Sequence, residues 1–335
     1  MHIGAKRPDL PLFFNAYRMA KDSKKSNKRI SHRPPHFPFE DPPFALSMGL
    51  LKIPDTEWFE IFDLTERASQ LMEKRRLLAS IFKDIFMADA SALQASISVL
   101  KLMLENLTTC RPDLYSLNKN TIELLPHKNF VGEKLSIDLK TNGMHPLDLA
   151  ARLVQEDLII MMPPEKYKKG WWLAAGSLAF PSRWNLNNKF SKTMDAIHAP
   201  VPFYKDQLKN PTNNFFDQMP YDEIFARRNW SLHDTPSLRQ DGTKPIVKTT
   251  HINSKNAGEQ LWLRVERQTL RKLKDTGAIL FTIRIHIRPL KQIEKFEGVA
   301  KRLAKALSAL PPEMQAYKQT NIFSDSVQEY LDQYS

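Results

Sequence analysis

LWLRVERQTLRKLKDTGAILFTIRIHIR, residues 261–288, contains two runs in which apolar and polar side chains alternate. Alternation with a period of two is typical of β-strands, because successive side chains point to opposite faces of a sheet. Asp275-Thr276-Gly277 lies between the runs and supplies turn-forming residues. We therefore predict strands over residues 261–270 and 278–288, joined as a β-hairpin.

The two faces of this predicted hairpin differ in chemistry. One face is apolar and belongs to the core, with Leu263 and Val265 in the first strand and isoleucines in the second. The opposite face carries a mixed-charge set: Arg264, Glu266, Arg284 and His286. Such a set is compatible with a solvated sheet face that carries cross-strand ion pairs, and equally with a functional site.

Outside the hairpin, helical and strand patterns alternate irregularly. A helical N-terminal layer over residues 41–145 includes helices at 66–84 and 90–106, with an N-cap at Asp55 or Thr56 before the first apolar residues. A polar, irregular segment follows at 111–142. Further elements are a helix at 147–156, strands at 158–162, 172–180 and 229–233, and C-terminal helices at 293–310 and 313–331. A few strands among helices, without a βαβ series, G-x-G-x-x-G or P-loop, predict an α+β fold: an antiparallel sheet flanked by helices.

Composition excludes several classes of protein. Apolar residues make up 42% of the 335, and no run approaches the roughly 20 apolar residues of a membrane-spanning helix. The single cysteine, Cys110, excludes an internal disulfide framework and a cysteine-rich zinc or iron–sulfur site. These features favour a cytoplasmic protein without a membrane span.

The net charge of +12 is concentrated near the N-terminus. Residues 1–33 hold nine Lys or Arg against two Asp, a net charge of +7. We predict that residues 1–40 form a basic, proline-rich and flexible tail. A basic tail can meet phosphates or an acidic partner, but no helix-turn-helix, zinc-finger or RNP spacing predicts specific nucleic-acid binding.

Three groups of motifs point to a family. The first is Gly170-Trp171-Trp172-Leu173-Ala174-Ala175-Gly176 followed by Phe180-Pro181-Ser182-Arg183-Trp184. The second is Ala196-Ile197-His198-Ala199-Pro200-Val201-Pro202. The third combines Arg228-Asn229-Trp230-Ser231 with Leu263–Leu270 and Thr276–Arg284. In this order they resemble the haem-dependent oxidative N-demethylase-like family, of the haem-binding α-subunit type.

This resemblance implies a PAS-like sheet that holds haem b. It implies one domain over residues 41–335, with a PAS-like core at 146–290 and C-terminal helices at 291–335. The implied activity is oxidative N-demethylation of a small secondary alkylamine, such as dimethylamine, to a primary amine and formaldehyde with O₂. Flavin (FMN) and iron–sulfur cofactors are expected on reductase partner subunits. The alternative is a haem-based sensor or carrier without catalysis.

The same resemblance suggests roles for individual residues. His198 is the expected iron ligand, in a stiff apolar loop, with a packed histidine bonded to a backbone carbonyl as the alternative. Cys110, His233 and His286 are weaker candidate ligands. Arg228 and Arg183, followed by Arg267 and Arg284, are expected to pair with haem propionates. Glu266 on the polar hairpin face is expected to anchor or deprotonate the ammonium, with Arg284 beside it, or else to form a structural salt bridge.

Overall fold

A computed structural model describes residues 36–39, 42–242 and 251–334. The largest element is a seven-stranded sheet in the order β1-β8-β9-β10-β6-β7-β2, in which every neighbouring pair is antiparallel. Its strands are β1 (Leu51–Ile53), β2 (Phe86–Ala88), β6 (Asp157–Met162), β7 (Trp172–Ser177), β8 (Ile224–His233), β9 (Trp262–Lys272) and β10 (Ile279–Pro289). The predicted α+β class and the β9–β10 hairpin are confirmed, and β8 begins five residues before its predicted start.

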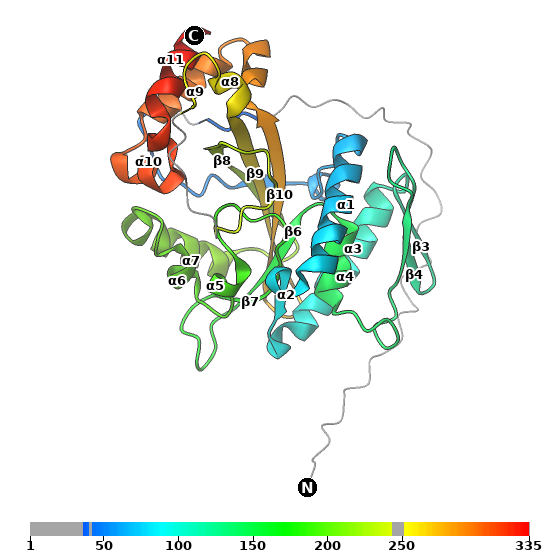
Figure 1. The fold of residues 1–335 in the computed structure, drawn as a ribbon. Coiled ribbons are helices and arrows are strands. Elements are labelled where there is room, and N and C mark those ends of the chain that lie inside the picture. The colour runs from blue at the N-terminus through cyan, green and yellow to red at the C-terminus, as the bar shows by residue number, and fades with distance from the viewer. Residues whose placement is uncertain (1–35, 40–41, 243–250, 335) are drawn as a thin grey trace. The chain divides into compact units, whose positions relative to one another are not determined.

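Helices cover both faces of this sheet. Figure 1 shows α1, α3 and α4 on one side and α5, α6 and α7 on the other. The helices are α1 (Leu64–Ser80), α2 (Phe82–Ile85), α3 (Leu93–Cys110), α4 (Pro146–Leu153), α5 (Leu186–Lys189), α6 (Met194–His198), α7 (Lys209–Gln218), α8 (Ala257–Gln260), α9 (Val299–Ser308), α10 (Pro312–Lys318) and α11 (Ser324–Asp332). Short turns lie at η1 (Asp55–Glu57), η2 (Ala90–Ala92), η3 (Tyr204–Leu208), η4 (Leu290–Lys295) and η5 (Thr320–Ile322). Among the described residues, no helix combines the length and apolar character needed to cross a bilayer.

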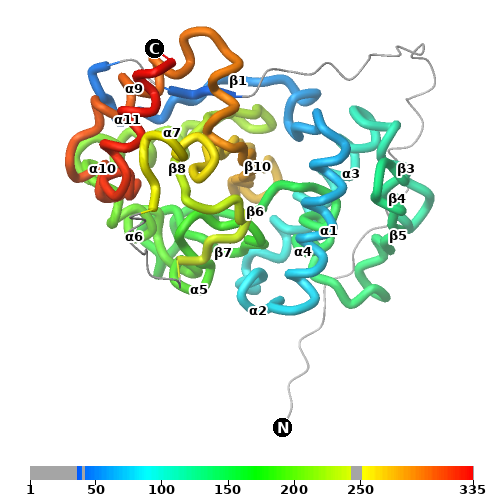
Figure 2. The backbone as a smooth tube through the Cα atoms, turned by 45° about the horizontal axis from the view of Figure 1, so that its top comes forward, coloured from blue at the N-terminus to red at the C-terminus, as the bar shows by residue number. Residues whose placement is uncertain are grey.

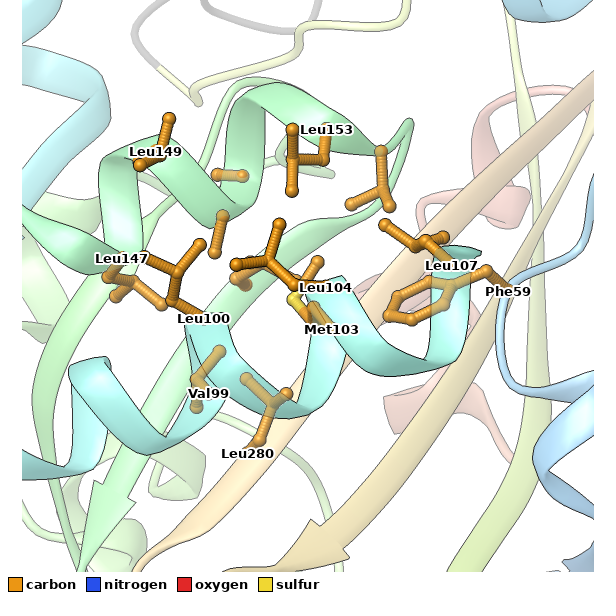
Figure 3. Packing of buried hydrophobic residues seen from close by; sticks show 14 of the residues in the cluster. Phe59, Val99, Leu100, Met103, Leu104, Leu107, Leu147, Leu149, Leu153 and Leu280 are labelled. Carbon is orange, nitrogen blue, oxygen red and sulfur yellow. The ribbon is translucent and has the colours of Figure 1, made fainter. Parts of the chain in front are cut away.

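The main core lies between the sheet and the helices α3 and α4. Leu100, Met103 and Leu104 of α3 are buried against α4, and Leu280 of β10 closes the cluster from the sheet side (Figure 3). Burying each such side chain stabilises the fold by roughly 1.5–3 kcal/mol. The spacing of apolar residues in α3 therefore explains why this helix lies on the sheet.

A second sheet occupies the segment that the sequence predicted to be irregular. The strands β3 (Tyr115–Asn118), β4 (Thr121–Leu124) and β5 (Glu133–Ser136) pair antiparallel. Figure 2 shows this small sheet beside α3, on the opposite side of the structure from α5–α7. The prediction was wrong because each strand has only four residues, too few for alternation to stand out from a polar background.

The first long helix begins later than its predicted N-cap. Asp55 starts only a single 3₁₀ turn, and α1 begins at Leu64 after Asp63, whose side chain accepts hydrogen bonds from Thr65 N (2.7 Å) and Glu66 N (3.0 Å). The residues between, 58–63, stay non-helical. In this conformation the carbonyls of Glu57 and Trp58 accept hydrogen bonds from Arg267 in the sheet.

Most of the predicted basic tail lies outside the described residues. Residues 36–39 are described, and they pack on the rest of the protein. Phe39 is buried with its ring 5.3 Å from that of Trp230, and the His36 imidazole contacts the Glu60 carboxylate. This end of the proline-rich segment is therefore part of the folded structure.

Candidate functional site

The strand register places the residues of the predicted polar hairpin face on two opposite faces of the sheet. In the β9–β10 ladder, Glu266 lies opposite Ile285, and Arg267 lies opposite Arg284. Residues directly opposite in an antiparallel pair point to the same face. Glu266 and Arg284 therefore point to opposite faces, and the prediction that they share one is wrong. The cause is the connection 273–278, which pairs Lys272 with Ile279 and so matches even positions of β9 with odd positions of β10.

One face of the sheet is directed toward α6 and α7. Phe225 of β8 packs against Phe215 of α7, with ring centroids 5.2 Å apart. Ile283 and Ile285 belong to the same apolar cluster as Met194 of α6. This face carries half-buried side chains on the neighbouring strands β8 and β9. Six of them form what we call the β8–β9 patch: Phe225, Arg227, Asn229, Ser231, Glu266 and Gln268.

The β8–β9 patch lies next to a sheet edge, because the outer strand β1 pairs only with residues 224–226 of β8. On the same strand β8, the alternate residues Ile224, Ala226, Trp230 and Leu232 are buried. Helices thus cover the opposite face here more completely than they cover the patch. Glu266 in the patch accepts a hydrogen bond from Gln268 Nε2 (3.0 Å) and lies 3.9 Å from Arg264 Nε.

His198 is the last residue of α6, so the predicted loop position is corrected to a helix end. Its Nδ1 lies 3.0 Å from the Met194 carbonyl oxygen, and its ring stacks on Tyr204 with centroids 4.8 Å apart. A carbonyl only accepts, so Nδ1 carries the proton and Nε2 keeps its lone pair. Burial, with the charges of Lys189 and Arg227, lowers the pKa of His198 below its usual range. The imidazole is therefore neutral and in the tautomer that a metal ligand needs.

Several contacts hold α6 in place. Thr193 Oγ1 caps its N-terminus at Ala196 N, and the Lys189 ammonium donates to the Ile197 carbonyl. Asp195 on α6 is paired with Lys209 (3.0 Å) and with Asn213 (3.2 Å) of α7. These contacts set the direction of the His198 ring relative to the sheet.

The opposite face of the sheet carries a buried ionic cluster around Glu60. Its Oε1 lies 3.0 Å from Arg267 Nε and 3.6 Å from Arg228 Nη2, and its Oε2 lies 2.9 Å from His36 Nε2 and 3.1 Å from His286 Nε2. Burial alone would raise the pKa of Glu60, but hydrogen bonds from the two histidines and the Arg267 charge outweigh it and hold the pKa far below its usual value. We call these five residues the Glu60 cluster.

Three of the arginines that were predicted to pair with haem propionates instead contact protein groups on the Glu60 face of the sheet. Arg228 and Arg267 belong to the Glu60 cluster, and Arg267 also donates to the Trp58 carbonyl (2.9 Å). Arg284 donates to the side-chain oxygen of Gln70 and lies 3.4 Å from Glu66. These contacts link α1 and residues 57–60 to the sheet.

Arg183 lies apart from both the β8–β9 patch and the Glu60 cluster, next to the end of α10. It donates to the Lys318 carbonyl (2.9 Å), and burial lowers its pKa to about 10. The structure therefore does not bring the predicted site residues into one group. Glu266 lies in the β8–β9 patch, His198 on the helix of the same side, and the four arginines in other surroundings.

The other candidate iron ligands are less suitable than His198, because they either have hydrogen-bond partners or have a raised pKa. Both ring nitrogens of His233 are bonded, to Ser231 Oγ (2.7 Å) and Gln240 Oε1 (2.6 Å), and burial lowers its pKa to about 2. His286 contacts Glu60 on the other face. Burial raises the pKa of the Cys110 thiol at the end of α3, which disfavours the thiolate form that binds metals.

One further group has metal-ligating atoms. One such atom from each of His36, Glu60 and His286 lies within 4.8 Å of the others. Arg267 and Arg228 approach the same carboxylate, however, so a divalent cation there would meet two positive charges. The geometry fits a carboxylate that accepts hydrogen bonds from two histidines better than a metal centre.

The surroundings of His198 fit a haem. An imidazole nitrogen with a free lone pair is a common haem ligand. Apolar side chains for the macrocycle are supplied by the cluster that includes Ile197, Val201 and Phe225. Arg227 of the β8–β9 patch, which acts on His198 electrostatically, could supply a positive charge for a propionate.

A family model described as "Haem-dependent oxidative N-demethylase, alpha subunit-like" matches residues 49–328. The chain belongs to this family. The suspected resemblance is thereby confirmed over most of the sequence, and the matched segment contains both His198 and the β8–β9 patch. As a haem-dependent oxidative N-demethylase α-subunit-like protein, the chain is assigned by its family name to the oxidoreductases.

Sequence reasoning missed Arg227 and Glu60. Arg227 adjoins the motif residue Arg228, and strand alternation alone would have placed the two on opposite faces. For Glu60 no local signal was present, because its partners come from positions 36, 228, 267 and 286.

Proposed function

We propose that this protein is the haem-binding subunit of an oxidative N-demethylase that converts a small secondary alkylamine, such as dimethylamine, to a primary amine and formaldehyde. The observation that carries the proposal is the state of His198: Nδ1 donates to a carbonyl, and Nε2 has no hydrogen-bond partner among the residues that the structure describes. Family membership supports the haem and the reaction class. The sheet with α5–α7 against it would be the PAS-like core that the resemblance implies.

The haem, when bound, would supply the iron that activates O₂ for oxidation of the amine's methyl group. Nε2 of His198 would hold that iron, while the Met194 carbonyl keeps the ring in the required tautomer. Arg227 would pair with a propionate from the sheet side, in place of the arginines Arg228 and Arg267 that are bound to Glu60. Electrons would come from FMN and iron–sulfur partner subunits.

Glu266 would prepare the amine. A small secondary amine carries a proton at neutral pH, and the ammonium has no lone pair for oxidation. The Glu266 carboxylate can bind this ammonium and accept its N–H proton, which frees the nitrogen lone pair. Gln268 holds one carboxylate oxygen in position at 3.0 Å.

The test is an absorption titration of the purified protein with haem. We expect a Soret band that is lost or shifted in His198→Ala and unchanged in His251→Ala, a matched change at an exposed histidine. If the wild-type protein gives no Soret band, the haem proposal fails. An unchanged band in His198→Ala would keep the haem and remove His198 as its ligand.

Turnover is tested separately with the haem-loaded protein, dimethylamine, O₂ and a chemical reductant, by measuring formaldehyde. Glu266→Gln is expected to retain the Soret band and to lose most formaldehyde formation. Haem binding without formaldehyde in the wild type would favour the sensor or carrier alternative.

A further inference from the structure

Three basic segments meet around α6. They are the loop between β6 and β7 (165–169), the approach to α6 (189–195), and η3 with the first residue of α7 (205–209). Together they hold seven lysines and three acidic residues. We call the seven lysines the lysine surface: Lys166, Lys168, Lys169, Lys189, Lys192, Lys205 and Lys209.

Direct contacts make these segments one surface. Lys168 Nζ donates to the carbonyl (2.7 Å) and the hydroxyl (2.6 Å) of Ser191, which joins the first segment to the second. The backbone N–H of Met194 donates to the Trp171 carbonyl (2.7 Å). Lys209 reaches Asp195 of α6 (3.0 Å), which joins the third segment. The lysines are thus held around the helix that ends in His198.

The lysine surface also presents a large aromatic side chain. Tyr167 is 82% exposed, more than any other aromatic residue in the described ranges. Its ring lies 5.2 Å from the Lys166 ammonium. Tyrosine is enriched in protein–protein interfaces, where its ring supplies contact area.

Lys189 connects this surface to the candidate iron ligand. Its ammonium donates to the carbonyl of Ile197, the residue before His198. A protein bound here would lie close to a haem on His198, and electron transfer between proteins requires such a short path.

We propose that the lysine surface is the docking site for the electron donor, an iron–sulfur or flavin protein with a carboxylate-rich surface. The role of this surface in electron transfer rests on the proposed function. The existence of the lysine surface rests only on the contacts described above. Opposite charge accelerates association by about 10- to 1000-fold at low salt and gives the weak, short-lived complexes that electron transfer uses.

Two charge-reversed proteins test the proposal. The first is Lys166→Glu/Lys169→Glu/Lys192→Glu, at three exposed positions of the lysine surface. The matched control, Lys101→Glu/Lys119→Glu/Lys140→Glu, makes the same change at three exposed positions on α3, in the β3–β4 turn and after β5, the region that Figure 2 shows across the sheet from α6. At high salt, where ions screen the effect of the new charges on this anionic reductant, both proteins should be reduced by dithionite at the wild-type rate, because neither change touches the haem site.

The probe is a reduced plant-type [2Fe–2S] ferredoxin, an acidic one-electron donor. At low salt, we expect haem reduction, followed at the Soret band, to be at least about tenfold slower in the first protein than in the control. At high salt the three rates should converge, since ions screen the attraction. Equal rates for the two triple variants at low salt would overturn the docking site.

A second readout does not need haem. Calorimetric binding of oxidised ferredoxin to the apoproteins should be lost in the first triple variant and retained in the control. If no haem binds at all, the proposed function fails while this comparison still decides the docking site. If the first triple variant instead loses affinity for a duplex DNA but keeps its affinity for ferredoxin, the surface is a nucleic-acid site and the proposal is wrong.

Discussion

Glu60 Oε1 and Arg267 Nε lie 3.0 Å apart, and both side chains are almost fully buried. This pair joins the non-helical segment before α1 to the inner strand β9. It lies on the face of the sheet that points away from His198. Glu60 and Arg267 therefore link this segment to the sheet, on the face opposite the proposed haem site.

We expect Glu60→Gln to destabilise the protein by about 3–5 kcal/mol, because the change leaves Arg267 and Arg228 without a counter-charge in a buried site. The free energy of unfolding is measured by urea titration. Glu165→Gln, at an exposed carboxylate, is the control and should change it by less than about 0.5 kcal/mol. Similar midpoints for the two variants would show that the Glu60 cluster contributes little.

Stability should fall as the pH is lowered from about 6.5 to 4. Burial lowers the pKa of His286 to about 4, so over this range the unfolded chain binds a proton at this residue that the folded protein does not. The depressed pKa of Glu60 acts in the same direction below its unfolded value, since only the unfolded carboxylate becomes protonated. The decrease in the free energy of unfolding that is due to His286 approaches about 3 kcal/mol at pH 4. Urea midpoints across this pH range should show a shallower slope for His286→Gln, and an unchanged slope would exclude His286 as a source.

Arg227 and Arg228 provide a matched pair of substitutions, because neighbouring residues of β8 point to opposite faces. We expect Arg227→Ala to weaken haem binding by about 10- to 100-fold, the loss of one charge-assisted hydrogen bond. Arg228→Ala should lower the free energy of unfolding and leave haem affinity near that of the wild type. Haem titration and urea unfolding of both variants give the comparison. A larger loss of haem affinity in Arg228→Ala would place the propionates on the Glu60 side.

Cys110 should behave as a half-buried, unreactive thiol. Burial, and then the charge of Asp55, raise its pKa, so little thiolate is present at pH 7. We expect iodoacetamide to alkylate it more slowly than free cysteine, with Cys110→Ser giving the wild-type Soret spectrum. A spectrum altered by Cys110→Ser would restore the thiolate as a candidate ligand.

The sequence by itself was sufficient for the longest local elements and for the family. Alternation over 261–288 predicted both strands of the hairpin, and apolar spacing predicted α1, α3 and α4, because both signals come from residues close together in the chain. The ordered motifs around His198 and Arg228 identified the family for the same reason. The strands β3–β5 have only four residues each, which is too short for such patterns to predict them.

Only the tertiary structure decided which charged residues meet. The pairing of Lys272 with Ile279 separates Glu266 from Arg284, and one residue of slip would reverse the result. Glu60 gathers partners from four distant positions of the chain, so neither spacing nor composition could reveal its cluster. Strand patterns show that side chains alternate, but the register and the packing of remote segments determine what they face.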